Sequence, residues 1–176
     1  MLQQSGNGNA VRDGFHQAEG DLLMILDADL TMPPEELPEY YDTLAEGHCE
    51  FGNGCRLVYP MKSEAMRFLN MITNKTFGIL FSWLLDQPIK DTLCGTKVLR
   101  RIDYDKISSN RSYFGDFDPY DDFDLLLGAD KLNLKIHDIP IRYKDRTYGE
   151  TNINRRTGGW LLLRMVIVAA RKLKFV

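Results

Sequence analysis

An apolar run over residues 22–26 leads directly into two aspartates, Asp27 and Asp29. A run this short is typical of a β-strand that is buried on both faces of a parallel sheet. A buried helix segment can show the same pattern, but Gly20 before the run and Pro33 after it favour the strand. We therefore expect both aspartates at the carboxyl end of a parallel strand, where open α/β sheets bind their ligands.

Asp27 and Asp29 are the candidate metal ligands. In an extended backbone, side chains two residues apart point in the same direction. Two converging carboxylates repel each other unless a cation lies between them, and Mg²⁺ or Mn²⁺ would bind such oxygens together with substrate phosphates. The alternative is an acidic loop whose aspartates cap the next helix, because Asp is a favoured capping residue. Residue types alone leave both interpretations open.

The composition narrows the classes of partner. The net charge of −3 gives no broad basic surface, so we expect no nucleic-acid partner. Cys49, Cys55 and Cys94 are odd in number and lack Cys-x-x-Cys spacing, which favours reduced thiols over a disulfide framework or a zinc site. The sequence shows no signal peptide, and we expect a cytoplasmic protein.

The remaining sequence predicts an α/β fold in which helices and strands alternate. We expect helices near residues 11–18, 34–46, 64–85, 118–132 and 160–176, and strands near residues 22–26, 50–59 and 134–143. Residues 91–99 are expected to form a loop that enters a further strand. The chain opens with a loop, a helix and a buried strand, so the first strands of a parallel sheet are expected to be missing. An open sheet edge would then favour self-association into a homo-oligomer.

The last segment, residues 160–176, is apolar up to Ala170 apart from Arg164, and basic after it. It is shorter than the roughly 20 apolar residues that span a bilayer. Its apolar body, its basic end and Trp160 suit a membrane interface. The alternative is a helix packed on the sheet. We assign residues 1–157 to a partial catalytic domain and residues 158–176 to a C-terminal amphipathic helix.

Five blocks in the sequence carry a family resemblance. They are Asp27-Ala28-Asp29-Leu30, Gly54-Cys55-Arg56, Asp91-Thr92-Leu93-Cys94-Gly95-Thr96-Lys97, the acidic helix start at 118–124, and Asp145-Arg146-Thr147-Tyr148-Gly149-Glu150-Thr151. In this order the chain resembles the family 2 glycosyltransferases, and within them the dolichyl-phosphate-mannose-synthase-like and polyprenyl-phosphate branch. The resemblance implies a GT-A fold: a Rossmann-like, mixed and mostly parallel sheet flanked by helices, here truncated at its N-terminus.

The resemblance also implies roles for individual residues. Asp27 and Asp29 match the family's Asp-x-Asp motif, which holds a divalent metal ion on the diphosphate of the sugar nucleotide. Arg56 and Arg146 match arginines of two family blocks, and Arg146 is expected to lie over the phosphates. Arginine suits this task because its planar group bonds phosphate oxygens in pairs. Arg67, on the long helix, is a further candidate for an acceptor phosphate. For each arginine, the alternative is an exposed surface charge.

Asp122 and Asp124 fall where the family carries its second carboxylate, and they are the candidate catalytic residues. An inverting transfer to a hydroxyl needs a base that takes the acceptor proton. A phosphate acceptor has a second pKa of about 6 and is largely dianionic at neutral pH, so its demand for a base is weaker. Positioning of the acceptor is therefore the other role open to these aspartates.

We accordingly expect metal-dependent transfer of a sugar from a nucleotide-sugar donor to an acceptor, a polyprenyl phosphate at the inner face of the membrane. Thr151 and Asn152 stand where the family carries Ser-Lys, which removes one cation. A truncated, non-catalytic remnant or binding domain is therefore an alternative. A transferase that acts on a soluble sugar acceptor is another.

Overall fold

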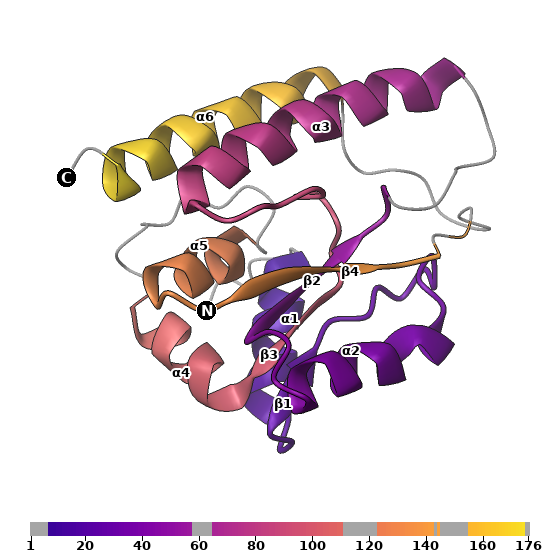
Figure 1. Ribbon diagram of the computed structural model, residues 1–176, viewed down its shortest axis with the longest axis vertical. Coiled ribbons are helices and arrows are strands. Elements are labelled where there is room, and N and C mark those ends of the chain that lie inside the picture. Colours follow the sequence, from indigo (N-terminus) through magenta and orange to yellow (C-terminus); the bar gives the residue numbers. More distant parts are fainter. Residues whose placement is uncertain (1–6, 58–64, 111–122, 143, 145–154, 175–176) are drawn as a thin grey trace, which may run out of the picture.

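The computed structural model describes residues 7–57, 65–110, 123–142, 144 and 155–174, which form a central sheet with helices around it (Figure 1). The strands are β1 (Leu22–Met24), β2 (Phe51–Cys55), β3 (Lys97–Arg100) and β4 (Ile136–Pro140). The helices are α1 (Asn7–Gln17), α2 (Leu37–Ala45), α3 (Ala65–Leu85), α4 (Arg101–Ser109), α5 (Phe123–Lys131) and α6 (Arg155–Leu173), with a short 3₁₀ helix at Pro34–Glu36.

The four strands form one mixed sheet in the order β1-β3-β2-β4. Strand β3 runs antiparallel to both β1 and β2, whereas β2 and β4 are parallel. Three strands therefore point in the same direction, which confirms the expected mixed, mostly parallel α/β fold.

The prediction that β1 is a parallel strand buried on both faces of the sheet is wrong in two respects. Its neighbour is antiparallel, and it lies at one edge of the described sheet, with alternating rather than complete burial. Self-association through a sheet edge stays a prediction.

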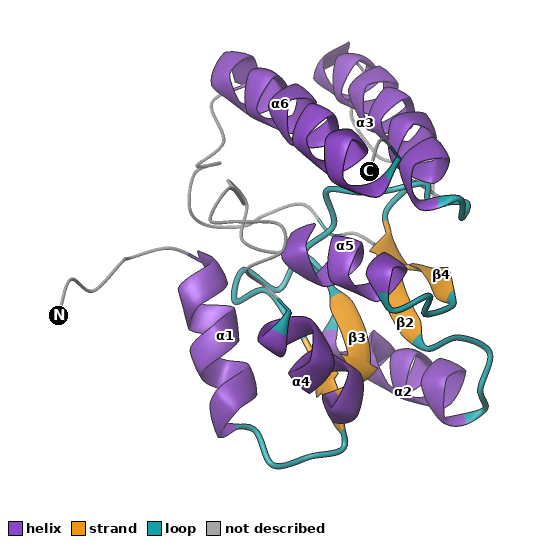
Figure 2. Cartoon of the chain, turned by 90° about the vertical axis from the view of Figure 1, so that its left-hand side faces the viewer, coloured by secondary structure: helices purple, strands orange, loops and turns teal. Residues whose placement is uncertain are grey.

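The strand register sorts apolar side chains onto the two faces of the sheet. Leu23 pairs with Leu99, and Leu99 pairs with Phe51, so these three side chains share one face. They belong to a large buried cluster with side chains from α1, α3, α4, α5 and α6. Val98, on the opposite face, packs with Leu44 of α2 in a smaller cluster. Figure 2 shows the resulting arrangement, with α2 on one side of the sheet and α1, α4 and α5 on the other.

Helices α3 and α6 lie side by side in an outer layer beyond α5 (Figures 1 and 2). Phe81 of α3 contacts Phe123 of α5, with ring centroids 5.2 Å apart. Met165 and Ala169 bury the inner face of α6 in the same cluster, but the helix packs in the outer layer beside α3 rather than on the sheet as one of the two interpretations expects. The helix begins at Arg155 and includes Gly158 and Gly159, so the expected start near residue 160 is wrong. Burial of its apolar face outweighs the low helix propensity of the two glycines.

Helix α4 is absent from the elements that the sequence predicts. Most of its residues are polar, but Tyr104 and Ile107 are buried and lie three positions apart, on one face of the helix. This weak apolar spacing is the only sequence signal for α4. The helix covers the sheet next to β3, and Tyr104 contacts Phe15 of α1 edge to face, with ring centroids 4.9 Å apart.

Candidate active site

The candidate site lies where β1, β2 and β4 end. Because these strands run in the same direction, their carboxyl ends meet at one edge of the sheet, where β3 begins. Backbone hydrogen bonds tie the segments at this edge together. Ile141 N–H donates to the Cys55 carbonyl at 3.0 Å, and Ile25 N–H donates to the Lys97 carbonyl at 2.9 Å. Asp27 therefore follows a strand end that is joined directly to β3.

Asp27 begins a tight turn. The Leu30 N–H donates to the Asp27 carbonyl at 3.1 Å, and Leu30 has a positive φ of 51°. The expectation of an extended backbone through Asp27 and Asp29 is wrong, because the chain reverses there. The carboxylate of Asp27 lies against Gly95: a Cβ atom at Gly95 would be 2.7 Å from Oδ2 and 3.1 Å from Oδ1. The turn at residues 27–30 therefore contacts the loop before β3, residues 91–96, through Asp27 and Gly95.

Thr31 holds the carboxylate of Asp29 in place. The backbone N–H and the hydroxyl of Thr31 both donate to Oδ1, at 3.1 Å and 2.9 Å. The N-cap position of the following 3₁₀ helix is Pro33, and that of α2 is Glu36. Neither N-cap residue makes a side-chain hydrogen bond to its helix. The alternative in which the aspartates cap the next helix is therefore wrong, and Asp29 instead stabilises a local turn.

The segment after β4 passes beside the turn that carries Asp29. Lys144 N–H donates to the Thr31 carbonyl at 2.7 Å, and Arg142 N–H donates to the Glu36 carboxylate at 3.1 Å. Of the residues with predicted roles, Arg146 and Asp122 lie outside the described residues. For Arg67 the structure describes only its place in the first turn of α3, and its side chain lies outside the description.

Arg56 forms an internal ion pair with Asp91. Arg56 Nε lies 2.7 Å from Asp91 Oδ2, and Nη2 lies 2.8 Å from Oδ1. The backbone N–H groups of Arg56 and Leu93 also donate to this fully buried carboxylate, both at 3.1 Å. Burial alone would raise the pKa of Asp91, but the hydrogen bonds and the charge of Arg56 outweigh it and lower the pKa. The interpretation of Arg56 as an exposed surface charge is therefore wrong.

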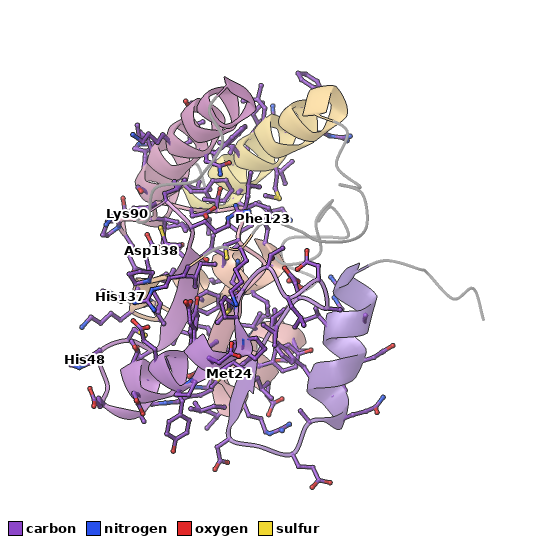
Figure 3. The ribbon with its side chains drawn as sticks, turned by 90° about the vertical axis from the view of Figure 1, so that its right-hand side faces the viewer. Met24, His48, Lys90, Phe123, His137 and Asp138 are labelled. Carbon is purple, nitrogen blue, oxygen red and sulfur yellow. The ribbon has the colours of Figure 1, made fainter. Side chains whose placement is uncertain are left out.

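The same ion pair belongs to a wider polar network. The Asn53 side-chain amide donates to the Asp91 carbonyl at 2.9 Å and to Asp138 Oδ1 at 2.7 Å. Lys90 N–H donates to Asp138 Oδ2 at 2.6 Å, and Figure 3 shows these two residues side by side below α3. Burial raises the pKa of Asp138. The network joins the loop before β3 to β2 and β4. The block 91–97 contributed to the resemblance, but no sequence signal identified Arg56 as the partner of Asp91.

Asp124 lies in the first turn of α5, and only 8% of its side chain is exposed. Its Oδ2 atom is 3.4 Å from Nη2 of Arg12 on α1. It also lines a cavity of about 100 Å³ together with Lys106, Ile107, Asn110, Gly128, Lys131 and Leu132. The structure therefore places Asp124 in an ion pair between α1 and α5.

The donor set at this edge suits a hard divalent cation. In the part of the chain that the structure describes, no three His, Cys, Asp or Glu side chains gather closely enough to hold a metal ion. Mg²⁺ is commonly bound by one or two protein carboxylates, with phosphate oxygens and water as its other ligands. Asp27 and Asp29, in one turn at the end of β1, fit this kind of site, in which the substrate supplies the remaining oxygens.

The outer surface of the α3 and α6 layer carries large apolar side chains. They are Ile79 and Trp83 of α3, and Trp160, Leu163 and Ile167 of α6. Arg164 and Arg171 are exposed along the same helix α6. Among the described residues, no helix combines the length and the apolar character needed to cross a membrane.

Comparisons with known proteins agree with the family resemblance. The family model described as Glycosyl transferase family 2 matches residues 2–108. Several similar bacterial proteins are named undecaprenyl-phosphate 4-deoxy-4-formamido-L-arabinose transferase. The one from Proteus mirabilis (strain HI4320) is 37% identical over 75 residues, which are 42% of this chain and 23% of that protein. The one from Enterobacter sp. (strain 638) is 29% identical over 150 residues, which are 83% of this chain and 40% of that protein. The chain thus spans less than half the length of these relatives.

Proposed function

The chain belongs to glycosyl transferase family 2, and on this premise we propose that it transfers a sugar from a nucleotide-sugar donor to a polyprenyl phosphate in a metal-dependent reaction. The observation that carries the proposal is the turn with Asp27 and Asp29 at the end of β1, where the strand ends of an α/β sheet bind ligands. The names of the relatives support a polyprenyl phosphate as acceptor.

Asp27 and Asp29 would hold Mg²⁺ or Mn²⁺ on the donor diphosphate. The metal ion would supply positive charge that stabilises the departing diphosphate. Thr31 supports this assignment because its backbone N–H and its hydroxyl both donate to Oδ1 of Asp29 and fix the orientation of the carboxylate. Positioned carboxylates of this kind lose less conformational entropy when they bind a cation than freely rotating ones.

The arginines would contribute further positive charge at the phosphates. We propose Arg146 as the main phosphate ligand, and the bond between Lys144 and Thr31 supports this role because it holds the chain two residues before Arg146 beside the turn of Asp29. Arg56 and Arg67 are further candidates for phosphate oxygens. Arg56 also fixes the loop before β3 through its ion pair with Asp91.

Asp122 and Asp124 remain the proposed catalytic or positioning carboxylates toward the acceptor. A polyprenyl phosphate is already largely ionised near neutral pH, so it needs little help from a base. The ion pair between Asp124 and Arg12 favours a positioning role for Asp124, because it fixes the direction of the carboxylate.

We further propose that the protein lies on the inner face of the membrane through α3 and α6. Trp83 is 52% exposed and Trp160 is 66% exposed, and both lie on the outer surface of this helix pair. An apolar surface that carries tryptophan and arginine side chains suits the headgroup region of an anionic bilayer. This location would bring the site to a lipid acceptor.

A calorimetric titration tests the proposed donor site. The protein is titrated with UDP or GDP, each with and without Mn²⁺, and we expect heat of binding that depends on the metal ion. Asp29→Ala should abolish this heat, whereas Asp42→Ala on the exposed surface of α2 should not. Unchanged binding by Asp29→Ala would contradict the metal assignment. The absence of metal-dependent heat from the unmodified chain would favour the non-catalytic alternative.

The acceptor is tested separately by competition. Sugar transfer to undecaprenyl phosphate is measured in the presence of an excess of free sugars, and we expect the free sugars not to compete. Preferential transfer to the free sugars would favour the alternative of a soluble acceptor.

A further inference from the structure

We propose that Gly95 is a positioning residue for the Asp27 carboxylate, because this carboxylate packs directly against the backbone of Gly95, which has no side chain. The functional part of this inference rests on the proposed role of Asp27 as a metal ligand. Its structural part does not depend on that role, because it concerns only the contact between the two residues.

The contact leaves no room for a side chain at position 95. A Cβ atom there would lie 2.7 Å from Oδ2 of Asp27, 3.1 Å from Oδ1 and 3.2 Å from Cγ. Real Cβ atoms essentially never approach another heavy atom to less than 3.0 Å. Glycine at this position therefore sets how deeply the Asp27 carboxylate can sit against the loop before β3.

The backbone on both sides of Gly95 is held in place. The fully buried side chain of Lys97 donates a hydrogen bond from Nζ to the Cys94 carbonyl. On the other side, the Thr96 carbonyl accepts a hydrogen bond from Gly54 N–H at 2.9 Å. Both carbonyls are buried acceptors, and a buried acceptor that loses its hydrogen bond destabilises the folded state. The loop cannot retreat from a methyl group at position 95 without breaking at least one of them.

The start of the same loop is anchored by Asp91. Its carboxylate accepts hydrogen bonds from Arg56 and from Leu93 N–H, and its carbonyl accepts one from Asn53. Fixed points thus lie at residues 91, 94 and 96. The atoms that this Cβ atom would meet belong to the side chain of Asp27, so a methyl group at position 95 would displace its carboxylate.

A double-mutant cycle tests the contact itself. Gly95→Ala should lower the midpoint of urea unfolding in the unmodified chain and should have a clearly smaller effect in the Asp27→Ala background, where the carboxylate is absent. The backbone at Gly95 does not have the positive φ that disfavours alanine. Gly14→Ala in α1 is the matched control, because a Cβ atom there has no heavy atom within 4 Å. Equal effects of Gly95→Ala in both backgrounds, or no effect, would overturn the structural inference.

Mn²⁺ binding tests the functional part. In a titration with Mn²⁺ and UDP, we expect Gly95→Ala to weaken binding at least about tenfold, the loss typical when a group that orients a metal ligand is changed. Circular dichroism checks that the variant is folded, and Gly14→Ala should bind like the unmodified chain. Equal binding by Gly95→Ala would overturn the positioning role alone. If the unmodified chain does not bind Mn²⁺ with UDP, the proposed metal function fails. The double-mutant cycle measured by urea unfolding still tests the contact between Gly95 and Asp27.

Discussion

Arg56 and Asp91 join β2 to the loop before β3 through two parallel hydrogen bonds, Nε to Oδ2 at 2.7 Å and Nη2 to Oδ1 at 2.8 Å. The carboxylate is fully buried, and 21% of the arginine side chain is exposed. The pair is therefore an internal support for the loop that faces Asp27. It also makes the stability of this edge of the sheet depend on a residue for which the sequence predicted either a phosphate ligand or an exposed surface charge.

Replacement of Arg56 tests this structural role. Arg56→Ala should lower the free energy of unfolding by about 3–5 kcal/mol, because it leaves the buried Asp91 carboxylate without its charge partner. Urea unfolding measures the change, and Arg171→Ala on the exposed surface of α6 should change it by less than about 0.5 kcal/mol. If Arg56→Ala is as stable as the control, the ion pair is not a structural support.

Removal of the Thr31 hydroxyl tests how Asp29 is oriented. Thr31→Val removes the 2.9 Å hydrogen bond to Oδ1 and leaves the backbone one in place. We expect Mn²⁺ binding in the presence of UDP to weaken about three- to tenfold, with a loss of stability of only about 1 kcal/mol. Thr43→Val is the matched control, because that hydroxyl bonds only the Glu39 carbonyl of its own helix. A Thr31→Val variant that binds as well as this control would argue against the orienting bond.

The exposed tryptophans of the outer helix pair test membrane binding. Replacement of both Trp83 and Trp160 by Ser should weaken binding to vesicles with anionic lipids about tenfold, equivalent to about 1.4 kcal/mol. Vesicle sedimentation measures the bound fraction. Tyr41→Ser on α2 removes an equally exposed ring from a different part of the surface and should leave binding unchanged. Equal binding by the double variant would contradict the proposed membrane surface.

Asp130 is expected to make the stability of the folded protein depend on pH. Burial raises the pKa of Asp130 to about 6, the nearby Lys174 opposes this change, and Asp86 adds to it. The folded state binds the proton of the Asp130 carboxyl group more tightly than the unfolded state does. The contribution of this proton to the free energy of unfolding is therefore complete below about pH 4 and is lost as the pH rises through 6. Asp130→Asn should remove this part of the pH dependence and stabilise the protein at pH 7 by about 1–2 kcal/mol after allowance for solvent screening.

Urea unfolding at pH 4, 5, 6 and 7 measures this effect as the difference between the variant and the unmodified chain. Asp42→Asn, an exposed residue of α2, should leave the pH dependence unchanged. A constant difference between Asp130→Asn and the unmodified chain over this range would show that Asp130 does not titrate near pH 6.

Local sequence patterns determined most of the elements of this protein. The long helix α3 and the strand β2 follow from apolar composition and spacing. Helix α2 ends at Ala45, close to the predicted end at residue 46, and Gly47 after it has a φ of 75°. The Asp27-Ala28-Asp29 motif after an apolar run marks the end of β1, the edge of the sheet at which we propose that ligands bind. These features are readable because periodicity, helix stops and short motifs depend on residues that are close in sequence.

Tertiary structure alone decided how the parts of the site support one another. The partner of Asp91 lies 35 positions away, at Arg56, and Gly95 meets Asp27 across two different segments. The antiparallel pairing of β3, which inserts this strand between β1 and β2, creates both contacts. No local pattern encodes such a pairing, because the register between distant strands is set by burial of their apolar faces in one common core.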